Sequence, residues 1–271
     1  MINDILSWFA DPANWSGESG VPHRLLQHLG YTAVSLLVAA LIAIPVGLAI
    51  GHTGRGRFLA INIAGAARAI PSLGLLYLMV LWLFPKLAGD SALVVPSIIV
   101  LIVLAIPPIM AGAYAGVEGV EPAARDAAKG MGMTGMQVLR QVEVPCAAPL
   151  IFSGLRSATL QVVSTATIAA VAGTGGLGRY LIDGQKLSDY EQMAAGALLV
   201  GGLALLLDLI LSIVQRTVVS PGLGGGRGSE RRGSSRGRAG VGAAARTGTS
   251  GNTPVDVEID SSGRTVDAPA R

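Results

Sequence analysis

The chain has 271 residues, of which 51% are hydrophobic and only 14% are charged, and its formal net charge is +3. A soluble domain of this length would carry about 25% charged residues, so this composition, with a mean hydropathy of +0.57, argues against a soluble fold. The single cysteine, Cys146, excludes an intrachain disulfide and any cysteine-based metal cluster.

The N-terminal residues do not have the basic start, short apolar core and small-residue cleavage site of a signal peptide. Residues 1–10, MINDILSWFA, place Ile2, Ile5, Leu6 and Phe9 on one helical face. This pattern predicts a short helix that lies on the membrane surface. Residues 1–23 are accordingly expected to form an extracytoplasmic segment.

Five apolar stretches follow, each close to the roughly 20 residues that a membrane-spanning helix needs. They cover residues 31–51, 60–85, 92–117, 157–178 and 193–214. The expected fold is therefore all-α, a polytopic membrane protein with five transmembrane helices. Two ionisable side chains, Arg68 and Asp208, fall inside these stretches. Such residues are by default functional candidates, but pairing between helices or snorkelling to the interface is favoured over proton carriage.

The distribution of basic residues between the loops predicts the orientation of the chain. One set of alternate loops contains five basic residues and the last span is followed by another: Arg55, Arg57, Arg125, Lys129, Arg140 and Arg216. In the other set, acidic residues offset the basic ones. Because basic loops stay on the cytoplasmic side, the N-terminus is expected outside and the C-terminus inside the cell.

Residues 217–271 form a Gly-, Arg- and Ser-rich stretch with almost no large apolar side chain. Such a segment cannot bury a core and is predicted to be a disordered cytoplasmic tail. No aromatic residue is interleaved with its arginines to stack on bases, so contact with anionic lipid headgroups is favoured over binding of nucleic acid.

Residues 126–145, DAAKGMGMTGMQVLRQVEVP, interrupt the apolar stretches with a short polar helix. Alanines favour a helix in its first half, three glycines then break it, and Pro145 is expected to close it before the next span. Ala124, Ala127, Ala128 and Met131 recur at helical spacing and form a small apolar face. A helix of this kind suits docking into the groove of a partner. The alternative is a loop helix that packs on its own bundle.

The spacing within this segment resembles the coupling motif of importer-type ATP-binding-cassette (ABC) permeases. That motif is E-A-A, three residues, G, nine residues and I-x-L-P, and here it corresponds to Asp126-Ala127-Ala128, Gly132 and Val142-Glu143-Val144-Pro145. The resemblance implies a helix that docks on a separate cytoplasmic ATPase. The residues implied for this contact are Asp126, Ala127, Ala128, Gly130, Gly132, Val144 and Pro145.

The same resemblance implies the partners of the chain. They are the ATPase, which would hold ATP and magnesium, a second permease chain, an extracytoplasmic solute-binding protein and the lipid of the cytoplasmic membrane. The chain itself has no Walker motif, so neither catalysis nor a bound cofactor or metal is expected of it.

Further stretches resemble the osmoprotectant branch of these permeases, which imports glycine betaine, choline, carnitine or proline betaine. They are ARAIPSLGLLYLM, IPPIMAGAYAGVE and AAVAGTGGLGRYLIDG, and the likeness covers residues 24–216, the expected type I transmembrane domain. Ala111-Gly112-Ala113 departs from the more polar residues of many relatives, and these side chains could face the pathway. A methionine- or sulfonate-type importer and a secondary carrier are the alternatives, although the inverted repeats of a carrier are not evident.

The stretch GTGGLG, with Gly173, Gly175, Gly176 and Gly178, satisfies a dinucleotide-binding pattern. Nucleotide binding is disfavoured, because a long apolar stretch precedes the glycines and the orientation puts them outside. A tight turn at the extracytoplasmic mouth is the preferred interpretation, and the resemblance places it near the gate. Pro107, Pro108 and Tyr114 are candidates for the translocation pathway, with a simple packing kink as the alternative for the prolines.

Overall fold

A computed structural model describes residues 2–58, 62, 65 and 69–218 of the chain. In these residues every regular element is helical, which confirms the predicted all-α class. The elements are α1 (Ile2–Ala10), η1 (Pro12–Trp15), α2 (Val21–Thr53), α4 (Ser72–Leu83), η2 (Phe84–Lys86), α5 (Ser91–Glu118), α6 (Pro122–Gly130), α7 (Gly135–Val138), η3 (Leu139–Glu143), α8 (Val144–Ala169), η4 (Ala170–Ala172), α9 (Gly178–Leu187) and α10 (Tyr190–Val218).

Four of these helical stretches in the described part of the chain are long and apolar enough to cross a membrane. They are Val21–Thr53, Ser91–Glu118, Gly135–Ala172 and Tyr190–Val218. The predicted span 60–85 falls partly outside the described residues. Its described part, α4, has 12 residues and is about 18 Å long, which is less than the roughly 30 Å hydrocarbon core of a bilayer.

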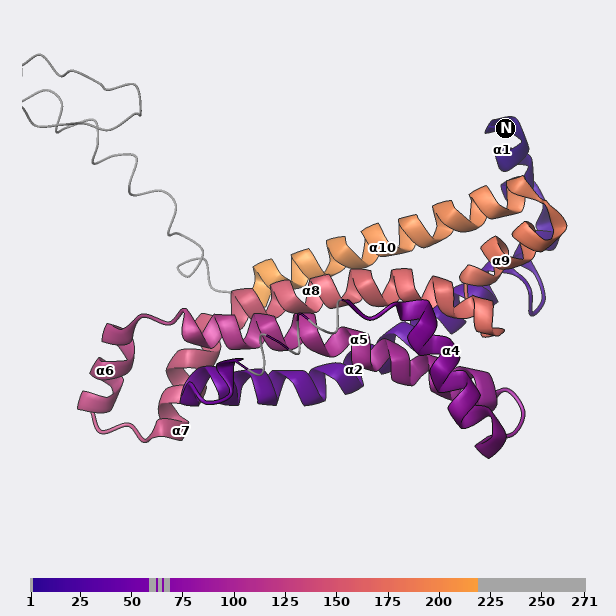
Figure 1. The fold of residues 1–271 in the computed structure, drawn as a ribbon. Coiled ribbons are helices and arrows are strands. Elements are labelled where there is room, and N and C mark those ends of the chain that lie inside the picture. The colour runs from indigo at the N-terminus through magenta and orange to yellow at the C-terminus, as the bar shows by residue number, and fades with distance from the viewer. Residues whose placement is uncertain (1, 59–61, 63–64, 66–68, 219–271) are drawn as a thin grey trace, which may run out of the picture. The chain divides into compact units, whose positions relative to one another are not determined.

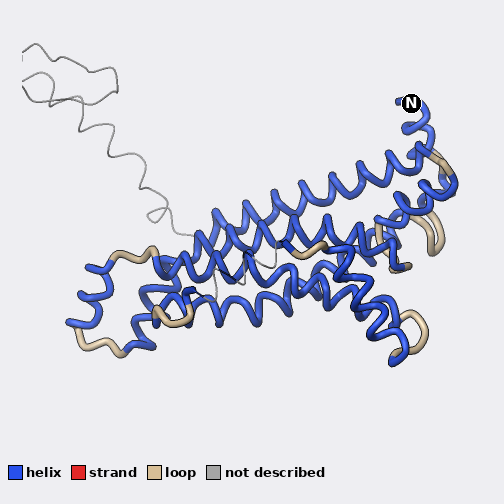
Figure 2. The backbone as a smooth tube through the Cα atoms, viewed as in Figure 1, coloured by secondary structure: helices blue, strands red, loops and turns tan. Residues whose placement is uncertain are grey.

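The long helices of residues 2–218 run side by side (Figure 1), and α5 packs between α2 and α8, while α10 packs on α8. Figure 2 shows most loops at the two ends of the bundle, while the short loop before α4 lies partway along it. One end carries α6 and α7, and the other carries α1, α9 and the start of α10. The segments that the sequence assigns to opposite sides of a membrane therefore lie at opposite ends.

Small residues let the helix backbones approach closely. A Cβ atom added to Gly112 would lie 2.5 Å from the carbonyl oxygen of Leu150, and one on Gly154 would lie 2.6 Å from that of Pro108. On the other side of α5, a Cβ on Gly47 would lie 2.7 Å from Met110 O. In lipid, where apolar surface gains nothing by leaving water, such close backbone contacts are a main source of helix association.

The predicted span 157–178 is wrong at both ends, because the helix starts earlier and stops before the glycines. Pro145 lies in the first turn of α8, directly after the π-helical turn η3. Residues 135–172 form one helical stretch through the π-helical turn η3. The prediction that Pro145 closes the polar segment is therefore wrong, because the helix continues through this residue into the span.

The helix predicted at the N-terminus exists as α1, but its buried face is centred on Trp8 and shares only the half-buried Ile5 and Phe9 with the predicted one. Trp8 is buried and packs edge-to-face on Tyr180 of α9, with ring centroids 5.4 Å apart. Leu6, assigned to the apolar face by its spacing, is 61% exposed. The indole covers more apolar area than a leucine, so its packing determines which side of α1 faces the bundle.

Candidate functional site

The segment with the coupling-motif spacing forms a hairpin of α6 and α7 at one end of the bundle (Figure 1). Pro122 starts α6 in its first turn, and α6 ends at Gly130. Gly132 has a φ of +84°, a conformation that only glycine adopts without strain. Before α7, the side chain of Gln137 accepts a hydrogen bond of 2.7 Å from the backbone N–H of Thr134. The glycines thus break the helix where the sequence predicts.

The surface of this hairpin presents most of the predicted contact residues. Asp126, Ala127, Gly130, Gly132 and Pro145 are exposed, and Val144 is half-buried. Met131 is 77% exposed and Met136 57%. The predicted apolar face is divided, however, because Ala128 is only 2% exposed and packs toward the bundle. The face left open is therefore the one that carries Ala127 and Met131.

A buried carboxylate at the base of the hairpin, that of Glu143 in η3, is 2% exposed. Its Oε1 lies 2.9 Å from Nε of Arg125 in α6, and its Oε2 lies 2.6 Å from Nδ1 of His52 in α2. A further guanidinium nitrogen of Arg125 donates to the carbonyl oxygen of Val117 in α5. A buried carboxylate is tolerated only when it is paired in this way. These contacts fix α6 to α2, α5 and η3.

Sequence reasoning did not identify Glu143 or His52 as functional candidates. Their contact joins residues 91 positions apart, so no helical or strand periodicity could indicate it. The only local signal was a carboxylate at the variable position of the motif, directly before the apolar part of α8.

A pocket of about 370 Å³ lies next to this cluster, at the ends of α2 and α5. Tyr114, a predicted pathway residue, lines it together with Arg57 and Glu118, which form an ion pair of 2.7 Å at the surface. Within the described residues the Tyr114 hydroxyl has no hydrogen-bond partner. Tyr114 is thus the pathway candidate that borders an open, polar space.

Pro107 and Pro108 lie inside α5, which continues past both of them. Pro107 is buried, and Pro108 contacts α8 through its carbonyl at Gly154. Gly112 and the fully buried Ala113 occupy the α5–α8 and α2–α5 contacts. These residues face neighbouring helices, as a packing kink would require.

The glycine turn, residues 173–178, lies at the opposite end of the bundle and packs on the start of α2. Gly173 and Gly176 have φ values of +96° and +90°, and the N–H of Gly176 donates a hydrogen bond of 3.0 Å to Oε1 of Gln27. A Cβ atom on Gly175 would lie 2.1 Å from that same oxygen, and one on Gly178 would lie 2.3 Å from Thr167 O. The glycines therefore serve a tight turn that packs on the start of α2.

The structure describes one of the two charged residues, Asp208 and Arg68, that the sequence places inside spans. Asp208 pairs with Arg156 of α8 through two parallel contacts, Nε–Oδ1 at 2.9 Å and Nη2–Oδ2 at 2.7 Å. This bidentate geometry agrees with pairing between helices, one of the two structural roles that the sequence left open. Arg68 lies outside the described residues. No group of three or more His, Cys, Asp or Glu side chains able to hold a metal occurs in the described part of the chain.

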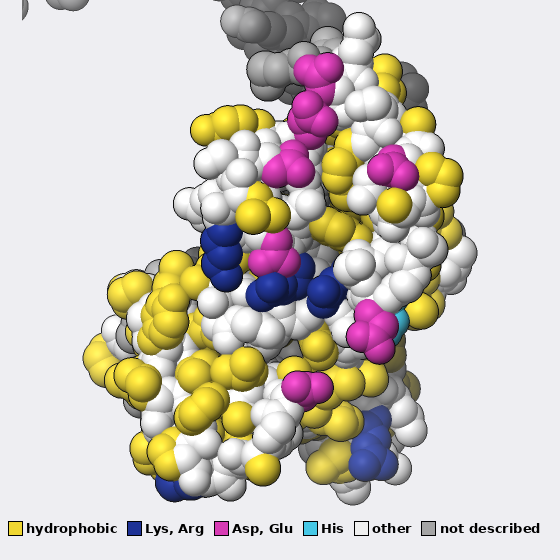
Figure 3. All heavy atoms as spheres, turned by 90° about the vertical axis from the view of Figure 1, so that its right-hand side faces the viewer, with side chains coloured by type: hydrophobic (Ala, Val, Ile, Leu, Met, Phe, Trp, Pro, Cys, Tyr) yellow, Lys and Arg dark blue, Asp and Glu magenta, His cyan; other side chains and the backbone are white. Residues whose placement is uncertain are grey.

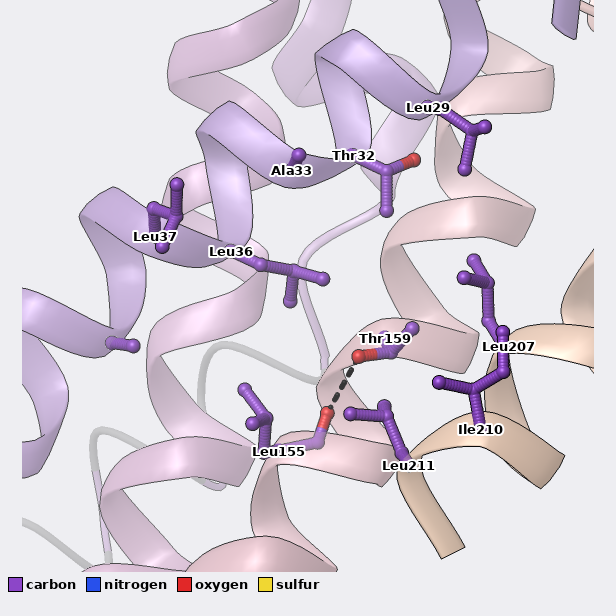
Figure 4. A pocket seen from close by; sticks show the side chains of 11 residues that line it. Leu29, Thr32, Ala33, Leu36, Leu37, Leu155, Thr159, Leu207, Ile210 and Leu211 are labelled. Carbon is purple, nitrogen blue, oxygen red and sulfur yellow. Dashed lines mark hydrogen bonds between the residues drawn. The ribbon is translucent and has the colours of Figure 1, made fainter. Parts of the chain in front are cut away.

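An apolar groove of about 390 Å³ lies between α2, α8 and α10. Figure 4 shows that leucine and isoleucine side chains from the three helices line it, and that the Thr159 hydroxyl donates to the carbonyl of Leu155 in its own helix. A charged solute would lose its hydration in this groove without gaining polar contacts. The groove therefore suits hydrocarbon and not a polar cargo.

Residues 35–220 match the family described as the binding-protein-dependent transport system inner membrane component. The chain belongs to this family. The match includes the α6–α7 hairpin, the Glu143 cluster and the glycine turn, so these features lie within the domain that defines the family. The chain is thus a membrane component of a transport system.

Curated relatives cover most of the chain. The glycine betaine/carnitine/choline transport system permease protein OpuCB of Bacillus subtilis is 33% identical over 73% of this chain and 88% of its own length. The osmoprotectant import permease protein OsmW of Salmonella typhimurium is 36% identical over 73% and 91%, respectively. Both are permease proteins by name, which agrees with the apolar helices described above.

Among solved structures, an inward-facing crystal form of the MetNI methionine ABC transporter contains a chain with the same fold. The TM-score is 0.61 at 23% identity, and the alignment covers 72% of this chain and 94% of that one. At this identity the likeness concerns the fold.

Proposed function

We propose that this chain is the permease subunit of an ABC importer that carries osmoprotectants such as glycine betaine, choline or carnitine across the cytoplasmic membrane. The names of the relatives that match 73% of the chain support this substrate class. Family membership supports the role of a membrane component served by a binding protein.

The observation that carries the coupling role is the α6–α7 hairpin. It exposes Asp126, Ala127 and Met131, while Arg125 and Glu143 tie its base to α2 and α5. A force on the exposed face therefore acts on the ends of the spans through a rigid contact. A separate ATPase, which would bind ATP and magnesium, is proposed to supply that force.

The remaining partners of the proposed importer are a second permease chain and an extracytoplasmic solute-binding protein. The small-residue faces of α2, α5 and α8 are used within this chain, so the second permease is proposed to pack on other faces. The chain itself is proposed to hydrolyse nothing.

Purification of the tagged chain from its host membrane, with identification of the co-purified subunits, tests this function. An ATPase and a solute-binding protein are expected. The complex in proteoliposomes should then accumulate radiolabelled glycine betaine, choline or carnitine only when ATP is supplied on the ATPase side, with methionine as the matched non-osmolyte control. Accumulation of methionine alone would reassign the substrate, and accumulation without any ATPase would overturn the ABC class.

A further inference from the structure

A polar pocket of about 240 Å³ lies at the end of the bundle that carries the glycine turn. Its walls come from the start of α2, the start of α5 and the turn itself; the lining side chains include Arg24, Gln27, Tyr31, Asp90 and Thr174. It is smaller than the roughly 300–1,000 Å³ of pockets for drug-sized ligands. The space fits a small solute.

The pocket places two opposite charges on different elements. Arg24 belongs to α2, and Asp90 directly precedes α5. Within residues 2–58, 62, 65 and 69–218, neither side chain forms an ion pair, and Arg24 donates only a long hydrogen bond of 3.3 Å to Gln27. Figure 3 looks onto this end and shows basic side chains gathered near the middle, with acidic ones beside them. Both charges are free to bind a ligand.

Gln27 is held in place by the turn, since its Oε1 accepts the N–H of Gly176 at 3.0 Å. The position of the pocket therefore depends on the closed glycine turn. Opening of this turn would change the shape of the pocket.

A buried, unpartnered hydroxyl borders the pocket. Thr174 is only 2% exposed, and its Oγ1 has no partner among the described residues. Thr174 and Tyr31 also line a second, much smaller cavity with Ser97, Leu101 and Ala166. The two cavities thus adjoin at Tyr31 and Thr174, and the second lies among the spans. An unpartnered buried hydroxyl is costly unless a ligand or water satisfies it.

We propose that this pocket is an entry subsite for a small zwitterion. Arg24 binds the carboxylate of the solute, because a guanidinium pairs with carboxylates through parallel hydrogen bonds. Asp90 and the ring of Tyr31 attract the quaternary ammonium by charge and by cation–π interaction. Thr174 supplies a buried hydroxyl at the wall of the pocket. This inference rests on the proposed import of osmoprotectants.

The chemical difference between glycine betaine and choline distinguishes the proposed role of Arg24 from that of Asp90. Glycine betaine carries a carboxylate and a trimethylammonium group, whereas choline carries the trimethylammonium group and a neutral hydroxyl. Loss of Arg24 should therefore impair transport of glycine betaine and leave choline nearly unchanged. Loss of Asp90 should impair both.

The test is uptake of radiolabelled glycine betaine and choline by cells that contain the complete transporter with Arg24→Gln, Arg24→Lys or Asp90→Asn. Arg24→Gln should lower the maximal rate for glycine betaine about tenfold, as expected for a lost charge-assisted hydrogen bond, and Arg24→Lys should restore part of it. The KM should change little, because the binding protein captures the solute first. Lys186→Gln is the matched control, since Lys186 is exposed at the same end and does not line the pocket.

The outcomes distinguish this subsite from the proposed function. Wild-type cells that import no quaternary ammonium solute would refute the proposed function. Wild-type import with equal losses of glycine betaine and choline in Arg24→Gln, or with no loss, would overturn the subsite alone. An equal loss in Lys186→Gln would assign the effect to docking of the binding protein. If only one solute is imported, Arg24→Gln must reduce it when it is glycine betaine and spare it when it is choline.

Discussion

At the scale of single residues, Glu143 connects parts of the chain that are far apart in sequence. Its two oxygens contact α6 through Arg125 and α2 through His52, and it is almost fully buried. Removing one partner of such a buried cluster leaves the other charge without compensation. The carboxylate is therefore a structural link between the exposed hairpin and the spans.

Glu143→Gln should destabilise this link and reduce coupling. The side chain keeps its size but loses its charge, so the unfolding free energy should fall by about 1–3 kcal/mol; the cost stays below that of a fully buried pair because Arg125 is 24% exposed. Uptake per ATP hydrolysed should fall as well. Both are measured on the purified complex, by thermal unfolding and by parallel transport and hydrolysis assays.

Glu118→Gln is the matched control for this change, because Glu118 pairs with Arg57 at the surface, where the two side chains are 41% and 61% exposed. An exposed pair contributes about 0–1 kcal/mol. If Glu143→Gln has no larger effect than Glu118→Gln, the buried cluster does not hold the hairpin.

Among single residues, those with a local signal were predicted and those with distant partners were not. Gly132 could be assigned to a break because glycine alone favours its positive φ. For Asp208 a structural role could be expected because a charge in lipid needs a partner or water, but neither the pair itself nor its partner Arg156 could be identified. The polar pocket at Arg24 was missed, since its walls come from three separate segments.

At the scale of elements, the α6–α7 hairpin depends on the turn at Gly132. Its φ of +84° lies in the left-handed region, and no atom lies within 4 Å of an added Cβ. A side chain at this position therefore costs about 1–2 kcal/mol in backbone strain. It would also clash with a partner that docks on the hairpin.

Gly132→Leu should abolish uptake and release the ATPase, and Asp126→Asn should only weaken both, because an exposed charge contributes little. Gly132→Ala should lie between them, since it adds the strain without the bulk. Gly201→Ala is the control, as Gly201 lies in α10, away from the hairpin, with open space around an added Cβ. Co-purification of the ATPase and solute uptake are the measurements. Full association and full transport in Gly132→Leu would show that the hairpin does not couple.

The elements also show where hydropathy misplaces a span. The charge at Arg156 suggested a span that starts after it, yet α8 begins at Val144 and holds Arg156 through its pair with Asp208. The turn at residues 173–178 carries no charge and so extends the uncharged stretch, but its backbone leaves the helix at Gly173. Neither the early start of α8 nor the end of the helix at Gly173 can be predicted from composition alone.

At the scale of the whole described bundle, the direction of the long helices shows how the chain crosses it. The end of α2 meets the end of α5 at Gly51 and Val117, and the start of α2 lines a cavity with the start of α5 at Tyr31 and Val94, so α2 and α5 are parallel. Their connection through residues 54–90 must cross from one end of the bundle to the other. A crossing at this point agrees with the prediction that successive loops lie on opposite sides of the membrane. That prediction is based on the distribution of basic residues and uses no information on packing.

The orientation of the bundle in the membrane is testable with single cysteines. Ser91 precedes the body of α5, and Ser188 lies in the exposed turn after α9, at the end with the glycine turn; Thr53 ends α2 near the hairpin. After the half-buried Cys146 is replaced by alanine, Ser91→Cys and Ser188→Cys should react with an impermeant maleimide in intact cells. Thr53→Cys should react only after the membrane is opened, because the basic loops face the cytoplasm. Labelling of Thr53→Cys in intact cells would put the hairpin outside, where no ATPase could reach it, and would refute the coupling role together with the orientation.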